Sequence, residues 1–266
     1  MKTSKTLVVT MLFFTLLLGV NVLAQEEPKP VFITVTTMHR NLENKDKDWL
    51  KTEQEFYDKV TSKNDLIIGS EILTHYYTAD NTEILHILVY KTWEDIEKSG
   101  EITDELVKKA WPDEAARKAF FNKQRSYYTT QHSDEIYTSQ PIVGYKPLKT
   151  DSKEPMIVYM RKTHLSMTGQ GKGLKEFNEK VTMKNPFIKG YYPHRHYWGA
   201  DSRDFIEVFL FDSMSDMEKS RDKDDELIKA AWPKEEDRKA FFDEMRKAVT
   251  GFHADYIYKN EPTMAK

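Results

Sequence analysis

The sequence contains no cysteine, and this absence limits both its chemistry and its means of stabilisation. Disulfides, cysteine-ligated zinc, iron–sulfur clusters and thiol nucleophiles are all excluded. Small secreted domains of animals depend on disulfides, so that kind of scaffold is disfavoured as well. The fold must therefore be held together by its core.

Several familiar functional signals are also missing. Lysine and arginine number 40 against 43 aspartate and glutamate, so there is no surplus of basic residues for nucleic acid. The sequence has no glycine-rich phosphate loop, no G-x-S-x-G elbow and no H-E-x-x-H run. No stretch beyond the first 24 residues is apolar enough to cross a bilayer. We expect neither a nucleic-acid partner nor a membrane span in the mature chain.

The N-terminus has the features of an export signal. Lys2 and Lys5 form a basic region, and the apolar run Leu7–Val20 follows it. The next residues, VLA at 22–24, provide the small side chains that signal peptidase accepts. We therefore predict a signal peptide over residues 1–24 and a periplasmic or extracellular location, in a bacterium.

A domain-sized stretch of sequence occurs twice. AWPDEAARKAFF, which begins at Ala110, returns as AWPKEEDRKAFF from Ala231. A shift of 121 residues aligns residues 75–141 with residues 196–262 without a gap, and 28 of the 67 aligned positions are identical. This period is that of a domain rather than of a solenoid repeat. The sequence therefore predicts a tandem duplication.

Each copy is predicted to contain the elements β-α-β-β-α-β, from alternating strand patterns and helical spacing. Extra helical turns are expected before the second helix. The first unit is expected over residues 25–149 and the second over 150–266. The expected strands cover 31–38, 66–77, 83–90 and 134–138 in the first unit, and 156–163, 187–198, 204–211 and 255–259 in the second.

This element order, repeated at this unit size, resembles the ferredoxin-like units of the dimeric α/β-barrel superfamily. Members include antibiotic-biosynthesis-type monooxygenases, haem-degrading enzymes, chlorite-dismutase-like haem proteins and stress-responsive barrel proteins. The resemblance implies an α+β fold in which the two units pack face to face as an intramolecular pseudo-dimer. No motif in the chain selects one subfamily, and a fold shared by so many activities does not fix a function.

The expected strands have one aliphatic face and one face richer in aromatic and ionisable side chains. We expect the aliphatic face to pack under the helices and the other face to line a shared interior. An aromatic lining with a few polar groups is typical of a small-molecule pocket. The expected interior residues include Thr36, Ile84, His86, Leu88, Tyr90, Tyr159, Arg161, Phe205, Glu207, Phe209 and Phe211.

Six of the eight histidines occupy matched positions in the two copies, as the pairs His39/His164, His75/His196 and His132/His253. Imidazole binds haem iron, zinc and copper, so the first two pairs are candidate ligand-binding residues, with haem as the cofactor to consider. The alternative is that these histidines bond loop carbonyls or pack on tyrosine. For the third pair we expect a structural role, and we assign no metal site from the sequence.

His86 and Glu207 occupy the same position in the two copies and interrupt an apolar strand face. Burial of an ionisable group is unfavourable unless it has a partner, so each is a candidate acid or base in a cleft. Alternatively, the face is partly solvated or the two side chains pair with each other. Arg161 either holds an anionic ligand group or forms an ordinary ion pair, and Tyr159 shares its face.

Three functions are compatible with these features. The leading hypothesis is an exported protein that binds a small apolar or aromatic molecule in an interior pocket, as a monomeric pseudo-dimer or a higher homo-oligomer. The second is an enzyme, either a cofactor-independent monooxygenase or a haem-binding protein. The third is an interaction or stress-response module of the cell envelope without catalysis.

Overall fold

The computed structural model describes residues 29–149, 153–167 and 172–266. The predicted signal peptide lies outside the described residues, so export stays a prediction. The first unit contains β1 (Phe32–Arg40), α1 (Trp49–Lys59), β2 (Ile67–Tyr77), β3 (Glu83–Tyr90), α2 (Trp93–Ala110), α3 (Glu114–Ser126) and β4 (Tyr128–Ser139). The second contains β5 (Ile157–Leu165), α4 (Leu174–Lys180), β6 (Gly190–Trp198), β7 (Asp204–Phe211), α5 (Met214–Ala231), α6 (Glu235–Arg246) and β8 (Val249–Asn260).

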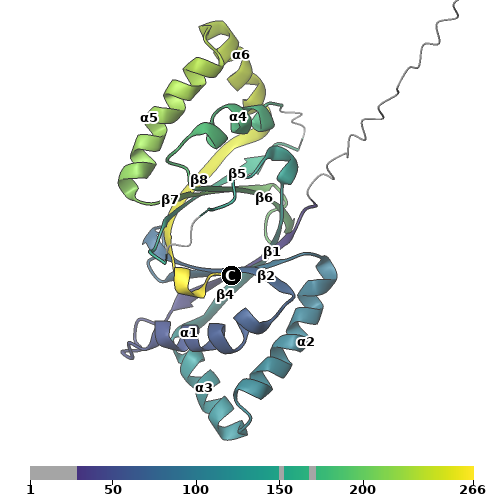
Figure 1. Ribbon diagram of the computed structural model, residues 1–266, viewed down its shortest axis with the longest axis vertical. Coiled ribbons are helices and arrows are strands. Elements are labelled where there is room, and N and C mark those ends of the chain that lie inside the picture. The colour runs from purple at the N-terminus through teal and green to yellow at the C-terminus, as the bar shows by residue number, and fades with distance from the viewer. Residues whose placement is uncertain (1–28, 150–152, 168–171) are drawn as a thin grey trace, which may run out of the picture.

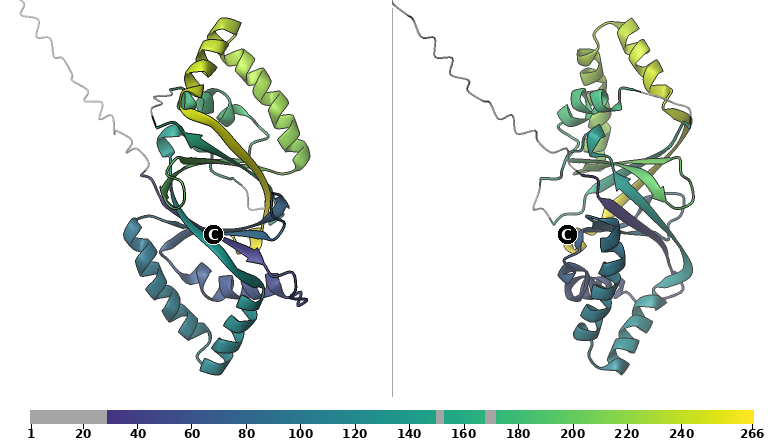
Figure 2. Two further views of the ribbon diagram at one scale, coloured as in Figure 1. Left: turned by 180° about the vertical axis from the view of Figure 1, so that it is seen from behind. Right: turned by 90° about the vertical axis from the view of Figure 1, so that its right-hand side faces the viewer.

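All eight strands form one closed antiparallel barrel in the order β1-β3-β2-β8-β5-β7-β6-β4. The barrel occupies the centre of the molecule, with α1 to α3 on one side and α4 to α6 on the other (Figure 1). Views from behind and from the side show the same layering (Figure 2). The fold is therefore α+β, with two duplicated units that close around one interior, as the sequence predicts.

The last strand of each unit joins the two halves. β4 pairs with β1 along most of its length, and its final residues pair with β6 of the second unit. β8 pairs in the same way with β5 and with β2 of the first unit. Both strands span 12 residues, longer than predicted, because each one bonds to a strand of both units.

The repeated AWP segment forms a corner between two helices. Trp111 follows α2, where its N–H bonds to the carbonyl of Val107 and its ring stacks on Phe120 with centroids 4.1 Å apart. Trp232 stacks on Phe241 in the same way at 4.0 Å. The sequence predicted only extra helical turns before the second helix of each unit. The structure has full helices there, α2 and α5, of 18 residues each.

The face that lines the barrel is the aliphatic one, so the face assignment made from the sequence is wrong. An eight-stranded barrel leaves just enough space for interior side chains to fill, which suits compact aliphatic groups. The face predicted to line the interior lies under the helices, where Ile84 packs near Trp49 and Phe209 packs near Met217. The buried interior cluster comprises Ile33, Leu73, Leu85, Tyr137, Met156, Val158, Met160, Ile206, Leu210 and Tyr258.

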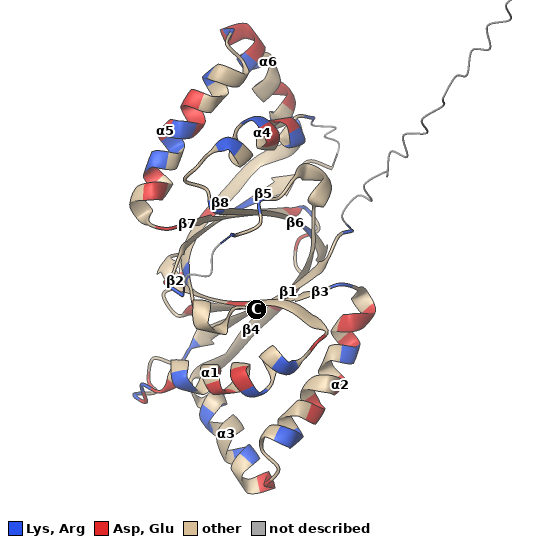
Figure 3. Ribbon diagram, viewed as in Figure 1, with Lys and Arg blue, Asp and Glu red and all other residues tan. Residues whose placement is uncertain are grey.

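The helices carry basic and acidic residues side by side along their length (Figure 3). Within the part of the chain that the structure describes, no helix has the length and apolar character needed to span a membrane.

Candidate functional site

Each unit has a cavity between its sheet and its helices. The first cavity has a volume of about 320 Å³ and lies between β1 to β3 and the helices α1 and α3. The second has a volume of about 440 Å³ and lies between β5, β7 and β8 and the helices α4 and α6. The aromatic and ionisable sheet faces lie under the helices instead of in the barrel, and part of each face lines one of these cavities. The main side chains of the first cavity are Thr36, Glu53, Phe56, His86, Leu88 and Tyr128.

A chain of hydrogen bonds crosses the first cavity. Nε2 of His86 lies 3.2 Å from the hydroxyl of Tyr128, which donates to Oε1 of Glu53 at 2.9 Å. The indole of Trp49 donates to the same hydroxyl at 2.7 Å. Gln124 donates to Oε2 of Glu53 at 3.1 Å, so both carboxylate oxygens accept a hydrogen bond.

These bonds assign the protonation of His86. A tyrosine hydroxyl has a single hydrogen, and here Glu53 accepts it. The hydroxyl of Tyr128 must therefore accept from Nε2 of His86, which leaves Nδ1 with a lone pair. No hydrogen bond to Nδ1 exists among the residues that the structure describes. The imidazole is thus an acceptor without a donor in a mostly apolar cavity.

Burial controls the charge of these groups. Desolvation lowers the pKa of His86 to about 4, so the imidazole is neutral at physiological pH. Desolvation also raises the pKa of Glu53, against hydrogen bonds from Tyr128 and Gln124 and the charge of Arg40. The pKa of Tyr128 is raised by burial and by the nearby Glu53 carboxylate, so its hydroxyl stays protonated.

The residues of this chain come from three different elements. Trp49 and Glu53 are four positions apart on α1 and therefore share its buried face. His86 lies on β3, and Tyr128 is the first residue of β4. Sequence reasoning found only His86. The signal for Glu53 was its spacing from Trp49, because a carboxylate on the tryptophan face of a helix must be buried with a partner.

The second cavity has a different arrangement at the matched position. Glu207 occupies the place of His86, and Arg161 donates to its Oε2 from Nε at 3.0 Å and from Nη2 at 2.6 Å. Tyr191 donates to Oε1 of Glu207 at 2.8 Å, and Asn178 donates to the hydroxyl of Tyr191 at 3.0 Å. The structure therefore shows the ordinary ion pair that the sequence left open for Arg161. His86 and Glu207 do not pair with each other, since they lie under helices of different units.

Tyr159 lines neither cavity. Its hydroxyl donates to Asp255 at 2.6 Å, and its ring stacks on Phe209 with centroids 5.6 Å apart. This contact extends the aromatic layer under α5, which contains Phe209 and Phe211. Tyr159 is therefore a packing residue next to the second cavity.

The matched histidines gather at one end of the barrel. β1, β2, β5 and β6 end there, and the other four strands begin there, so we call this end the histidine mouth. The registers place His39 opposite Glu83, His164 opposite Asp204, His75 opposite Tyr258 and His196 opposite Tyr137. The sequence-predicted histidines therefore lie at the end of the barrel and line neither cavity.

Most of these histidines have local partners. Nδ1 of His39 lies 3.0 Å from Oδ2 of Asp80, and Nδ1 of His75 lies 2.7 Å from the hydroxyl of Thr78. Nε2 of His196 is buried and has no hydrogen bond among the described residues. The exposed His132 and His253 lie 3.5 and 3.6 Å from the aspartates two positions further on, Asp134 and Asp255.

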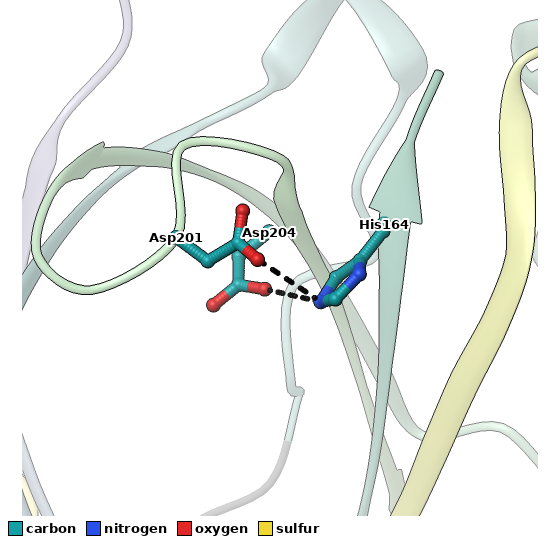
Figure 4. A group of neighbouring side chains, drawn as sticks. All are labelled: His164, Asp201 and Asp204. Carbon is teal, nitrogen blue, oxygen red and sulfur yellow. Dashed lines mark ion pairs between the residues drawn. The ribbon is translucent and has the colours of Figure 1, made fainter. Parts of the chain in front are cut away.

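His164 has two carboxylates next to it. Its Nε2 lies 3.3 Å from Oδ1 of Asp204 and 3.5 Å from Oδ2 of Asp201 (Figure 4). Asp204 belongs to β7, and Asp201 belongs to the turn that precedes it. Of the matched histidines, His164 is the one at which three groups able to hold a metal ion converge.

Neither cavity offers haem a histidine that is both shielded from solvent and free at Nε2. His86 is the only histidine among the residues that line the first cavity, and its Nε2 is bonded to Tyr128. His253 at the second cavity is 62% exposed and lies beside Asp255. The pairs His39/His164 and His75/His196 face the histidine mouth instead. We therefore assign haem to neither cavity.

Comparisons with known proteins support the fold. No protein-family model and no curated protein matches the sequence. Among solved structures, the chain is similar to a candidate monooxygenase from Fusobacterium nucleatum, with a TM-score of 0.56 and 9% identity over 87% of this chain and 92% of that one. It is also similar to a candidate monooxygenase from Lactobacillus acidophilus, with a TM-score of 0.52 and 8% identity over 88% and 95% of the two chains.

A weaker likeness extends to chlorite dismutase from Candidatus Nitrospira defluvii, with a TM-score of 0.48 and 13% identity over 88% of this chain and 92% of that one. At these identities the likenesses to the two candidate monooxygenases show the fold and nothing further. The chain has the architecture of the dimeric α/β-barrel proteins, with both halves of the barrel in one polypeptide.

Proposed function

We propose that this protein is exported and binds a small molecule in the first cavity. The ligand is aromatic or otherwise apolar and carries one hydroxyl or N–H group that donates to Nδ1 of His86. The observation that carries the proposal is a neutral, half-buried imidazole with a free acceptor nitrogen in a cavity of about 320 Å³. A volume of this size lies within the range of small-molecule pockets.

The physical argument rests on the unpaired nitrogen. A ligand that covers this nitrogen without a donor leaves it unsatisfied at a cost of about 1–3 kcal/mol, whereas a ligand that supplies the donor avoids this penalty. The surrounding Phe56 and Leu88 contribute apolar surface. Because the cavity offers an acceptor that is held in one tautomer by Tyr128 and Glu53, it selects ligands with a donor over isosteres that lack one.

An enzyme is the second candidate function, in which Nδ1 of His86 accepts a proton from a ligand hydroxyl while Nε2 keeps its bond to Tyr128. Burial lowers the pKa of His86 to about 4, so this transfer suits an acidic ligand hydroxyl. The bond from Tyr128 to Glu53 fixes the orientation of the imidazole. The names of the two candidate monooxygenases support a role in chemistry on a small molecule.

A pair of probes tests the binding proposal. We expect 1-naphthol to bind the mature chain more tightly than 1-methoxynaphthalene, in which a methyl group replaces the hydroxyl hydrogen, when both are titrated by calorimetry. The substitution H86A should reduce the affinity for 1-naphthol about tenfold and remove the preference. E207Q is the matched control in the second unit and should change neither. Equal affinities for the two probes, or equal losses in H86A and E207Q, would contradict the proposal.

A further inference from the structure

We propose that His164, Asp201 and Asp204 bind a divalent transition-metal ion at the histidine mouth of the barrel (Figure 4). This site is separate from both cavities, and its existence does not depend on the function proposed for the first one. It combines one imidazole nitrogen with two carboxylate oxygens that come from β5, β7 and the turn before β7.

The spacing of the three atoms fits a small metal ion. Zinc bonds to nitrogen and oxygen are about 2.0–2.1 Å long, so neighbouring ligand atoms of a tetrahedral site lie about 3.4 Å apart. Nε2 of His164 lies 3.3 Å from Oδ1 of Asp204 and 3.5 Å from Oδ2 of Asp201. Little movement is needed to place an ion between these atoms. The three ligands leave a fourth position for water or a substrate group.

An unsatisfied oxygen provides a second, independent indication. Oδ1 of Asp204 is buried and accepts no hydrogen bond in the described part of the chain, although the residue is only 2% exposed. Its other oxygen, Oδ2, accepts a bond from Lys162 at 2.7 Å. A buried carboxylate oxygen that faces an imidazole nitrogen without a hydrogen bond is well explained by an ion that both atoms share.

The first unit shows why this oxygen is free. At the matched position, Glu83 accepts a hydrogen bond from Tyr258 at 2.5 Å. The counterpart of Tyr258 is Tyr137, whose hydroxyl donates to Glu135 instead of to Asp204. Asp204 has therefore lost the donor that satisfies its counterpart.

The histidine of the first unit is also arranged differently. His39 uses Nδ1 to contact both Asp80 at 3.0 Å and the hydroxyl of Thr82 at 3.2 Å. The polar groups around His39 therefore bond to one another, whereas Nε2 of His164 lies next to two carboxylates. The ring of His164 is held in this orientation because it stacks on Phe252, with centroids 3.9 Å apart.

The neighbouring cations are compatible with a metal. Lys162 bonds to Asp204, and Arg203 donates to Asp201 from Nε at 2.9 Å and from Nη2 at 2.6 Å. Together they balance the two carboxylates, so the surroundings are close to neutral. Neutral ligand sets bind zinc well, as sites of three histidines do, and outer hydrogen bonds orient carboxylate ligands. The imidazole in the set favours a transition ion over Mg²⁺.

Calorimetric titration with ZnCl₂ at pH 7.5, on the mature chain without an affinity tag, tests the proposal. We expect one zinc ion per chain, a rise in Tm with zinc, and no binding of MgCl₂. H164N and D204N should weaken zinc binding at least about tenfold. Because Asp204 is buried, D201N supplies a variant at a more exposed position, and it should weaken binding as well.

H39N is the matched control and should bind zinc as the unchanged chain does. The proposal is overturned if the unchanged chain takes up no zinc, or if H39N loses as much affinity as H164N. It is also overturned if NMR finds both ring nitrogens of His164 protonated at pH 7.5 in the presence of zinc, because the histidine would then be an ion-pair partner of the two aspartates.

Discussion

The two units place different side chains at the same point beneath their helices. In the first unit His86 ends a chain of bonds with one nitrogen left free, whereas in the second unit the carboxylate of Glu207 bonds to both Arg161 and Tyr191. On the helix side, Glu53 of α1 bonds to Tyr128 in the first unit, whereas Asn178 of α4 bonds to Tyr191 in the second. The duplication has thus produced one site with an unpaired acceptor nitrogen and one site whose carboxylate is fully hydrogen-bonded.

This difference separates binding from stability. A buried charge is tolerated only with a partner, so the second unit depends on its ion pair. The first unit keeps a neutral imidazole, which is tolerated without a partner at a smaller penalty. We therefore expect substitutions of the ion pair in the second cavity to affect mainly folding, and substitution of His86 in the first cavity to affect mainly ligand binding.

The largest effect is expected from R161A. This change leaves Glu207, which is buried, without its cation, and we expect the free energy of unfolding to fall by about 3 kcal/mol. The counterpart of Arg161 in the first unit is Thr36, whose hydroxyl donates to the exposed Asp134. T36A should therefore change stability by less than about 0.5 kcal/mol. Urea unfolding of both variants measures the two losses in stability. Similar losses would show that the Arg161–Glu207 ion pair has no special role in folding.

A second effect is the pH dependence of stability that arises from Glu71, whose counterpart in the second unit is Tyr192. Burial raises the pKa of Glu71 to about 7, so the folded chain holds a proton that the unfolded chain releases above its ordinary pKa of 4.5. Stability should therefore fall as the pH rises from 4.5 to 7, by up to about 3 kcal/mol.

E71Q tests this dependence, because the amide does not titrate. Its free energy of unfolding should change little between pH 4.5 and 7, and it should exceed that of the unchanged chain at pH 8. Y192F is the control at the matched position, and it should keep the pH dependence of the unchanged chain. If the curve of E71Q also falls with pH, another group is responsible.

The smallest effect is expected from Y128F. It removes the hydroxyl that joins His86, Trp49 and Glu53, and we expect a loss of about 1–2 kcal/mol in stability. Affinity for 1-naphthol should fall as well, since Nε2 no longer has a fixed acceptor. Y191F should cause a similar loss of stability in the second unit without a change in 1-naphthol binding. Calorimetry with 1-naphthol on the two folded variants distinguishes these outcomes.

Much of the fold follows from the sequence because the duplication doubles the evidence for every element. The alternation of β3 and β7 correctly groups His86 with Ile84 and Glu207 with Phe205. It does not say which group faces the barrel, because both faces of these strands are apolar enough to be buried. The choice depends on the width of the barrel and on the space under the helices, which are properties of the assembled fold.

The candidate site was harder to predict for a similar reason. Glu53 and Tyr128 are 75 positions apart and meet His86 only when α1 and β4 pack on the sheet. The matched histidines were predicted as a set from the repeat, and the topology brings them to one end of the barrel. The acidic residues opposite His39 and His164 bond differently in the two copies. Glu83 accepts a bond from Tyr258, whereas Asp204 accepts none from Tyr137. A pattern of identical residues carries no information about that difference.

The strands that close the barrel also govern when it forms. The edge of β2 in the first unit is covered by β8 of the second, so that Leu73 pairs with Asn260. During synthesis this edge has no partner until β8 has been made. Unpaired edges invite association between chains, so a chaperone that delays folding would help the protein. Export of the unfolded chain before folding would have the same benefit, because both units would then start to fold together.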